Sequence, residues 1–292
     1  MKGLEGFEEI VRTQEKLAPY TYLKLGGPAE ALIQPRSREE LMAIVRRCLE
    51  QSIPMRVLGG GCNILVRDEG VRGVVLRLSE AMFTEVSVDG RRVRAGTGAR
   101  LSALISQSAR HNLAGLEPLI GIPGTVGGAL RGNAGDRSGE IGPYVRLVEV
   151  LDDAGELQVR ERDELRFAYR SSNLDEPVLL AAEFDLESDS SDAIVKRMRK
   201  AWIERRAAQP LSYQAAVRLF KDQRGMNPAV LIEQAGLART RVGGAELSEK
   251  DANFAVAHPG ASSRDVLRLI DLVSSRVRER LNVDLELQIT IW

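Results

Sequence analysis

Short runs of apolar residues alternate with helical patterns in the first third of the chain. Residues 31–33, 55–58 and 73–78 are apolar runs of strand length. Ser37 is followed three residues later by Glu40, which predicts a capping box at a helix start. The apolar positions that follow predict one buried helix face, formed by Leu41, Ile44, Val45, Cys48 and Leu49. The pattern therefore predicts alternating strands and helices in this part of the chain.

The middle of the chain has the pattern of antiparallel hairpins. Asp89-Gly90 lies between two alternating apolar runs and is a strong signal for a two-residue hairpin turn. Residues 145–159 predict a second hairpin that turns near residues 152–155, and residues 178–186 predict another strand. A helix between the two hairpins is expected to bury Leu101, Leu104, Ile105 and Ser108.

The last third begins with a change of composition that predicts a domain boundary. Residues 187–192 are acidic, and residues 196–206 form a basic helical run, which favours a solvated helix face over a phosphate-binding patch. Asn227-Pro228 is typical of a helix start, and Gly236 is typical of its end. The last helix is expected to bury a stripe formed by Val266, Ile270, Val273, Val277 and Leu281.

Composition narrows the classes of protein that the pattern allows. The chain has 292 residues, with 41 Lys and Arg against 41 Asp and Glu, and only 4% aromatic residues. A neutral charge and few aromatics argue against a nucleic-acid binder. Residues 1–16 lack the apolar stretch of a signal peptide, and no apolar run is long enough to span a membrane. With two cysteines, Cys48 and Cys62, a disulfide is not expected, and we predict a reduced, cytoplasmic protein.

Two glycine-rich segments are candidates for a cofactor site. Gly59-Gly60-Gly61-Cys62-Asn63 follows a predicted strand, where side-chain-free backbone lets N–H groups converge on an anion. It is neither a P-loop nor a dinucleotide-binding fingerprint, and alone it favours a tight turn. A second segment runs from Gly121 through Thr125 to Gly135. Two such segments in one domain favour a large nucleotide cofactor over two unrelated turns.

The order of motifs along almost the whole chain resembles the UDP-N-acetylenolpyruvoylglucosamine reductase (MurB) family, in its shorter type. The matching motifs are Gly26-Gly27-Pro28-Ala29, residues 58–65, residues 115–135, Tyr169-Arg170-Ser171-Ser172, Gln209-Pro210-Leu211, residues 231–237, Gly243-Gly244-Ala245 and Ser248-Glu249-Lys250. The resemblance implies an α+β fold, in which a vanillyl-alcohol-oxidase/PCMH-type FAD-binding domain precedes a MurB-type α+β substrate domain. We expect the first domain at residues 1–190, with lobes of about 1–80 and 81–190, and the second at 191–292.

The resemblance also implies a reaction and a set of site residues. The family moves hydride from NADPH to FAD and then to the enolpyruvyl double bond of a UDP-sugar, which yields UDP-N-acetylmuramate for peptidoglycan. Arg170 matches the arginine that polarises the substrate carboxylate, and Tyr169 and Lys221 are expected to bind substrate. The expected FAD-binding residues are Gly59, Gly60, Gly61, Cys62, Asn63, Ile64, Gly121, Ile122, Pro123, Gly124, Thr125, Gly127, Gly128, Asn133, Ala134 and Gly135.

Several positions in the substrate half depart from the family pattern. Arg218 stands at the place of the proton-donating serine in a Ser-x-Phe-Lys-Asn-Pro-like segment, and a guanidinium does not give up its proton in a protein. Gln288 replaces the catalytic glutamate of a Leu-Glu-x-Glu pattern. Glu286 would share its strand face, about 7 Å away, if this segment is a strand. Asp251 and Ala257 replace the usual histidine and asparagine, and Cys62 replaces the serine of the flavin turn.

Three interpretations follow from these departures. The first is a working flavin reductase of the MurB type whose proton relay is rebuilt from other groups, such as Ser212 or Tyr213. The second is a catalytically degenerate homologue that binds flavin or a UDP-sugar. The third is a flavin reductase of another electron-poor alkene. His111 and His258 lack metal-ligand neighbours in the sequence, so no metal is expected, and the chain is expected to act as a monomer on a nucleotide sugar.

Overall fold

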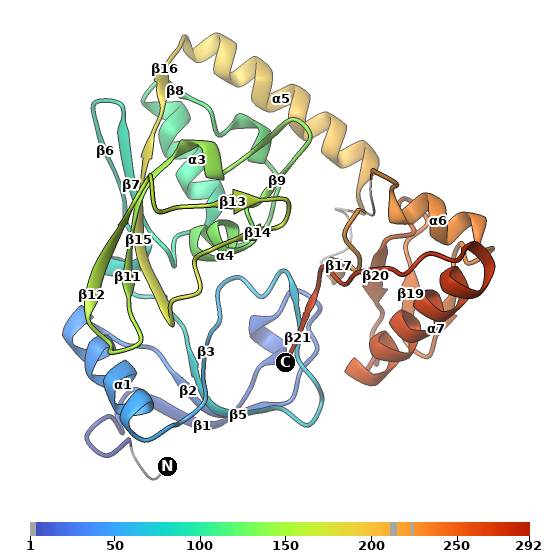
Figure 1. Cartoon of the computed structure of the whole chain (residues 1–292), viewed down its shortest axis with the longest axis horizontal. Coiled ribbons are helices and arrows are strands. Elements are labelled where there is room, and N and C mark those ends of the chain that lie inside the picture. The colour runs from blue at the N-terminus through green and yellow to red at the C-terminus, as the bar shows by residue number, and fades with distance from the viewer. Residues whose placement is uncertain (1–3, 211–214, 223–224) are drawn as a thin grey trace. The chain divides into compact units, whose positions relative to one another are not determined.

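The chain folds into two compact units, and neither is a continuous stretch of sequence (Figure 1). A computed structural model describes residues 4–210, 215–222 and 225–292. The first unit holds the start of the chain up to Gln14, together with Glu30–Gly60 and Arg72–Glu204. The second holds Glu15–Ala29, Gly61–Val71 and Arg205–Trp292.

Two short segments from the first quarter of the chain belong to the second unit, which differs from the predicted division at residue 190. The physical reason is a shared core, in which Leu23, Leu25 and Leu65 pack with the C-terminal helices. The strand β21 (Thr290–Ile291) also pairs in parallel with β4 (Ile64–Leu65). A boundary read along the chain cannot show segments that return to a later part of the fold.

A four-stranded sheet and one helix form the first core. The strand order is β1 (Val11–Lys16), β2 (Pro28–Ile33), β5 (Val71–Leu76) and β3 (Met55–Val57). The helix α1 (Arg38–Glu50) begins at Ser37, whose side chain accepts the Glu40 N–H at 3.1 Å. Four of its predicted face residues are buried, whereas Leu49 is 36% exposed, so the predicted face is one residue too wide.

The second core of this unit lies on a five-stranded antiparallel sheet. Its strands are β12 (Leu157–Glu161), β11 (Val145–Leu151), β15 (Val178–Asp185), β7 (Arg92–Gly96) and β6 (Val86–Asp89), in that order. The helices α3 (Leu101–Arg110) and α4 (Val126–Arg131) pack their buried residues against it. Both predicted hairpins are confirmed, although Asp89 pairs with Arg92, so the first turn is formed by Gly90 and Arg91.

The second unit is built on a small antiparallel sheet covered by two helices. Its strands are β17 (Ala216–Arg218), β20 (Phe254–Ala257), β19 (Ala245–Leu247) and β18 (Arg241–Val242). The helices are α6 (Pro228–Gln234) and α7 (Ser263–Leu281), and Ser262 with Asp265 forms a complete capping box at the start of α7. Four of the five residues of the predicted α7 stripe, Val266, Ile270, Val273 and Val277, are buried. The fifth, Leu281, is only partly buried against the same core.

The remaining elements are short, apart from the helix α5 (Ser191–Ala208), which joins the two units along the chain. They are η1 (Ala18–Tyr20), α2 (Ala81–Thr84), β8 (Leu113–Ala114), η2 (Glu117–Leu119), β9 (Gly135–Asp136), β10 (Gly139–Glu140), η3 (Gly142–Tyr144), β13 (Phe167–Ala168), β14 (Ser171–Ser172) and β16 (Glu187–Ser188). Within the described ranges, no helix has the length and apolar character needed to cross a membrane.

Candidate functional site

The two glycine-rich segments meet within the first unit, at Gly59 and Thr125. A Cβ atom on Gly59 would lie only 2.4 Å from Thr125 Oγ1, so a side chain at this position would force the Thr125 side chain to move. Thr125 is the N-cap of α4, and its side chain accepts the Gly128 N–H at 3.5 Å. The end of the first segment and the start of α4 are therefore neighbours, as a single ligand that contacts both segments requires.

Glycines of the second segment serve different purposes. Gly121 and Gly124 have φ angles of +83° and +125°, which side chains rarely adopt, so backbone geometry requires glycine at both positions. A Cβ on Gly128, in contrast, would meet only Thr125 Oγ1, at 3.7 Å, so neither packing nor strain requires glycine there. The missing side chain leaves the first turn of α4 open. This backbone fits the approach of a flat cofactor such as a flavin dinucleotide.

The end of the second glycine segment is tied to the segment that carries Arg170. The Asn133 amide donates to the carbonyl oxygen of Ala168 at 3.0 Å, and Asn133 is 1% exposed. The Ser172 hydroxyl donates to the Arg131 carbonyl oxygen at 3.1 Å. The Asn133 side chain is thus bonded to the protein itself, and it holds together two motifs that lie 35 residues apart.

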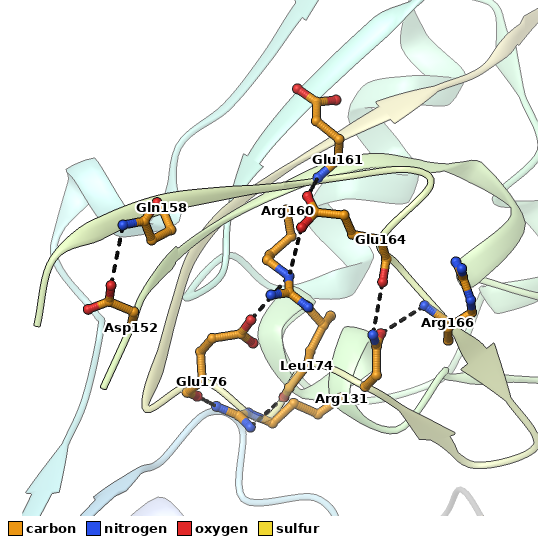
Figure 2. Close-up of polar contacts among 10 residues, drawn as sticks. Arg131, Asp152, Gln158, Arg160, Glu161, Glu164, Arg166, Leu174 and Glu176 are labelled. Carbon is orange, nitrogen blue, oxygen red and sulfur yellow. Dashed lines mark hydrogen bonds and ion pairs between the residues drawn. The ribbon is translucent and has the colours of Figure 1, made fainter. Parts of the chain in front are cut away.

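Arg131 contributes a second set of bonds between the same two segments. Its guanidinium donates to the carbonyl oxygens of Leu174 and Glu176, at 2.7 and 2.5 Å (Figure 2). The Glu176 carboxylate also pairs with Arg160 of β12 at 3.4 Å, so the carbonyl acceptors lie on an anchored loop. Burial lowers the pKa of Arg131 from its ordinary value, although the side chain keeps its charge at neutral pH. No sequence pattern identifies Arg131, because its acceptors are main-chain atoms.

Arg170 is held in a defined position with one donor unused. Its Nη1 donates to the carbonyl oxygen of Gly135, and its backbone has a φ of +55°. Its guanidinium carbon lies 5.4 Å from the centre of the Tyr169 ring. The Arg170 Nε is buried and has no hydrogen-bond partner within the protein. A permanent cation with a buried, unused donor is suited to bind a carboxylate.

Gly61, Cys62 and Asn63 of the first glycine segment belong to the second unit. Gly61 has a φ of +63°, and its carbonyl oxygen accepts the Tyr22 N–H at 2.9 Å. Burial raises the pKa of the Cys62 thiol to about 11, against a smaller opposing effect of Lys24. Cys62 therefore stays protonated near neutral pH, which disfavours a nucleophilic role. The Asn63 amide donates to the Gln288 carbonyl oxygen at 2.9 Å, so these two predicted site residues are neighbours.

The segment that contains Glu286 and Gln288 is not a strand, which corrects the expectation of a shared strand face. It makes a single bridge, between Leu287 and Phe220. Glu286 is exposed and pairs with Lys221 at 2.5 Å, whereas Gln288 is half-buried. The Gln288 Oε1 atom is buried without a hydrogen-bond partner. Glu286 is therefore paired with the lysine that is expected to bind substrate.

Arg218 at the serine position forms an ion pair with Asp222, at 2.8 Å. Its Nε is buried and has no hydrogen-bond partner. Burial also raises the pKa of the nearby Asp251 carboxyl. Ser212, Tyr213 and Gln223 lie outside the described residues.

The histidines of the chain make local contacts. His258 Nε2 lies 2.8 Å from Glu246 Oε2, and the His111 ring bonds to the Gln107 carbonyl oxygen at 2.9 Å. Across the part of the chain that the structure describes, no group of three or more His, Cys, Asp or Glu side chains is placed to hold a metal ion. Both cysteines are free thiols.

Comparison with known proteins agrees with the geometry of both units. Residues 29–160 match the FAD binding domain family, and residues 209–292 match the UDP-N-acetylenolpyruvoylglucosamine reductase C-terminal domain. The chain is 42% identical to UDP-N-acetylenolpyruvoylglucosamine reductase 2 of Symbiobacterium thermophilum, over 97% of this chain and 92% of that protein. It is 40% identical to the reductase of Moorella thermoacetica, over 98% and 95% of the two chains.

A solved structure extends the similarity to three dimensions. The UDP-N-acetylenolpyruvylglucosamine reductase of Thermus caldophilus matches with a TM-score of 0.83 and 36% sequence identity. The match covers 97% of this chain and 99% of that chain. The similarity therefore includes both the region of the FAD binding domain match, residues 29–160, and the region of the C-terminal domain match, residues 209–292.

Proposed function

The chain belongs to the UDP-N-acetylenolpyruvoylglucosamine reductase (MurB) family, and on that premise we propose that it reduces the enolpyruvyl group of UDP-N-acetylglucosamine enolpyruvate with NADPH. The product would be UDP-N-acetylmuramate. FAD is the cofactor of this family, and residues 29–160 match an FAD binding domain. The observation that carries the proposal is the buried, unused Nε of Arg170, held at the end of the second glycine segment.

The chain's own residues supply binding and charge. FAD would be held by Gly59, Thr125 and Gly128. Gly59 lies close to Thr125, and no side chain covers the backbone at Gly128. Bound there, FAD would supply the hydride-transfer chemistry that links NADPH to the alkene. Arg170 would pair with the substrate carboxylate and stabilise the negative charge that builds up there as hydride adds. The unused Nε gives this arginine a donor that is free for the substrate.

The direct test follows the colour of the protein. Purified protein loaded with FAD should lose its visible flavin absorbance when NADPH is added without oxygen. Adding UDP-N-acetylglucosamine enolpyruvate should then restore the oxidised spectrum within one turnover. A folded protein that does not bind FAD, or whose reduced form is not reoxidised by this substrate, would contradict the proposal.

A catalytically degenerate homologue is the second candidate, and one observation favours it. Arg218 and Gln288, at the positions of the proton donor and its acidic partner, each carry a buried polar atom without a partner. Neither side chain exchanges a proton near neutral pH. Calorimetric binding of the UDP-sugar without flavin reoxidation would support this candidate, whereas a screen of other electron-poor alkenes tests the third interpretation.

The nucleotide-sugar substrate and NADPH favour the cytoplasm as the location of the proposed reaction.

Arg131 provides a prediction about the segment that carries Arg170. Arg131→Met removes the donors to the Leu174 and Glu176 carbonyl oxygens, so the segment that holds Arg170 loses an anchor. We expect the substrate-dependent reoxidation rate to fall by about 10²-fold, since small misplacements of a catalytic group are costly. Flavin reduction by NADPH should be unchanged.

Arg131→Lys is the matched control for this prediction, because it keeps one donor and should recover part of the rate. Equal losses in both half-reactions would instead indicate general destabilisation. An unchanged reoxidation rate in Arg131→Met would show that the other bonds to this segment position Arg170 without it.

A further inference from the structure

Arg170 lies at the turn of a short hairpin, and its backbone is in an unfavourable conformation. The strands β13 and β14 pair Ala168 with Ser171, so the two residues between them form the turn. Arg170 is the second of these and has a φ of +55°, a left-handed conformation that residues other than glycine and asparagine rarely adopt. Such a conformation persists only where the surrounding structure stabilises it. The bonds that hold this hairpin therefore determine where the Arg170 guanidinium lies.

A buried asparagine joins the hairpin to the end of the second glycine segment. The Asn133 amide nitrogen donates to the Ala168 carbonyl oxygen at 3.0 Å and to Glu140 Oε2 at 2.7 Å. Its Oδ1 atom accepts the Gly142 N–H at 3.1 Å. Both hydrogens of the amide group are thus in use within the protein, so this side chain has no donor left for a ligand.

Glu140 determines which way the Asn133 amide faces. A carboxylate only accepts hydrogen bonds, so it selects the amide nitrogen rather than the amide oxygen. If the amide were turned over, its oxygen would face the Glu140 carboxylate and the Ala168 carbonyl, and its nitrogen would face the Gly142 N–H. Each of these contacts would place two acceptors or two donors together. Glu140 thereby ensures that Ala168, two residues before Arg170, receives a donor.

Glu140 is itself fixed against the residue that binds the Arg170 side chain. On β10 it is the register partner of Gly135 on β9, whose carbonyl oxygen accepts from Arg170 Nη1. A Cβ on Gly135 would lie 2.9 Å from the Glu140 Cγ atom, so the start of the Glu140 side chain packs against this glycine. The hairpin of β9 and β10 thus presents two acceptors, one for the Arg170 guanidinium and one for Asn133. All of these residues belong to the first unit.

We propose that Glu140 is a positioning residue for Arg170, and that it acts through Asn133 on the main chain that carries this arginine. The inference rests on the proposed function, in which Arg170 pairs with the substrate carboxylate. The hairpin of β9 and β10 holds the arginine by its main chain and by its side chain. The buried, unused Nε donor therefore meets the carboxylate without rearrangement.

The test uses FAD-loaded, full-length protein and three variants. Glu140→Met removes the acceptor at nearly constant size, and reoxidation of the reduced flavin by UDP-N-acetylglucosamine enolpyruvate should slow by about 10–10²-fold. Glu140→Gln keeps an acceptor oxygen and should recover most of this loss. Glu161→Gln, at an exposed position of β12, should react as the wild type does. Flavin reduction by NADPH should be unchanged in all three variants.

A double variant separates the positioning of Arg170 from a general effect on the fold. If Glu140 acts through Arg170, Glu140→Met should slow reoxidation no further once Arg170→Ala is present. A protein that is only destabilised would lose the same factor in both backgrounds. That outcome, or a Glu140→Met protein that reoxidises at the wild-type rate, would overturn the inference and leave the proposed function intact.

Hydrogen exchange gives a readout that needs no substrate. The main-chain amides of residues 165–174 should exchange faster in Glu140→Met than in the wild type, whereas those of α1 should not change. Unchanged exchange in residues 165–174 would mean that other bonds hold this segment, and the inference fails. A wild type that NADPH reduces but the substrate never reoxidises would instead refute the proposed function. The exchange result would still decide whether Glu140 fixes the segment that carries Arg170.

Discussion

Arg170→Ala is expected to slow substrate-dependent flavin reoxidation by about 10²–10³-fold, the cost of removing one preorganised group that stabilises developing charge. The unused Nε of Arg170 is buried, so the interaction with a substrate carboxylate would form away from bulk water, where it is strong. Single-turnover mixing of the NADPH-reduced protein with substrate measures this rate directly. FAD binding and reduction should be unaffected.

Two companion variants make the Arg170 result specific. Arg170→Lys keeps the charge but loses the fork geometry of the guanidinium, so it should restore only part of the rate. Arg137→Ala removes an exposed arginine from the turn between β9 and β10 and should leave the rate unchanged. If Arg170→Ala reoxidises as fast as the wild type, the substrate carboxylate is bound by other residues.

Asn253→Ala is expected to lower the free energy of unfolding by about 2–5 kcal/mol, because it leaves two buried backbone groups unpaired. These groups are the N–H and the carbonyl of Phe220, which is itself fully buried. Phe220 belongs to the hydrophobic core of the second unit, so these groups lie away from solvent. Urea unfolding followed by circular dichroism, with FAD absent from every sample, measures the loss.

The exposed residue Gln234 provides the control for Asn253. Gln234→Ala on α6 should change the free energy of unfolding by less than about 0.5 kcal/mol, as is usual for surface positions. A loss below about 1 kcal/mol in Asn253→Ala would mean that the Phe220 backbone finds other partners.

Elements set by local chemistry could be predicted from the sequence. The caps Ser37 and Asn227 work through bonds that span two or three residues, and their helices begin where the pattern indicates. The errors are local as well. Glu40 accepts the Arg36 N–H instead of completing a capping box with Ser37, and Leu49 sits at the edge of its helix face. Which N–H group Glu40 binds and how deeply Leu49 is buried depend on small free-energy differences. The pattern of apolar and polar residues does not resolve them.

The site was only partly predictable, because its organisation depends on contacts between distant main-chain atoms. Glycine density identified the two segments, but not that Gly59 faces Thr125. Arg131 and Asn253 were missed because both bond to backbone carbonyl or N–H groups, and any residue offers those groups. Lys221 pairs with Glu286, which lies between α7 and β21 in a segment without regular secondary structure. No repeating sequence pattern predicts this contact.

The interleaved second unit has a consequence for synthesis of the chain. Residues 15–29 and 61–71 leave the ribosome well before residues 205–292 exist, yet Leu23, Leu25 and Leu65 need those later residues to be covered. Arg67 and Leu65 hydrogen-bond to the main chain of Trp292, so this pairing forms only after residue 292 has been synthesised. Until the later residues are made, these leucines lack most of the core that covers them. The growing chain therefore exposes apolar surface, on which chaperones act.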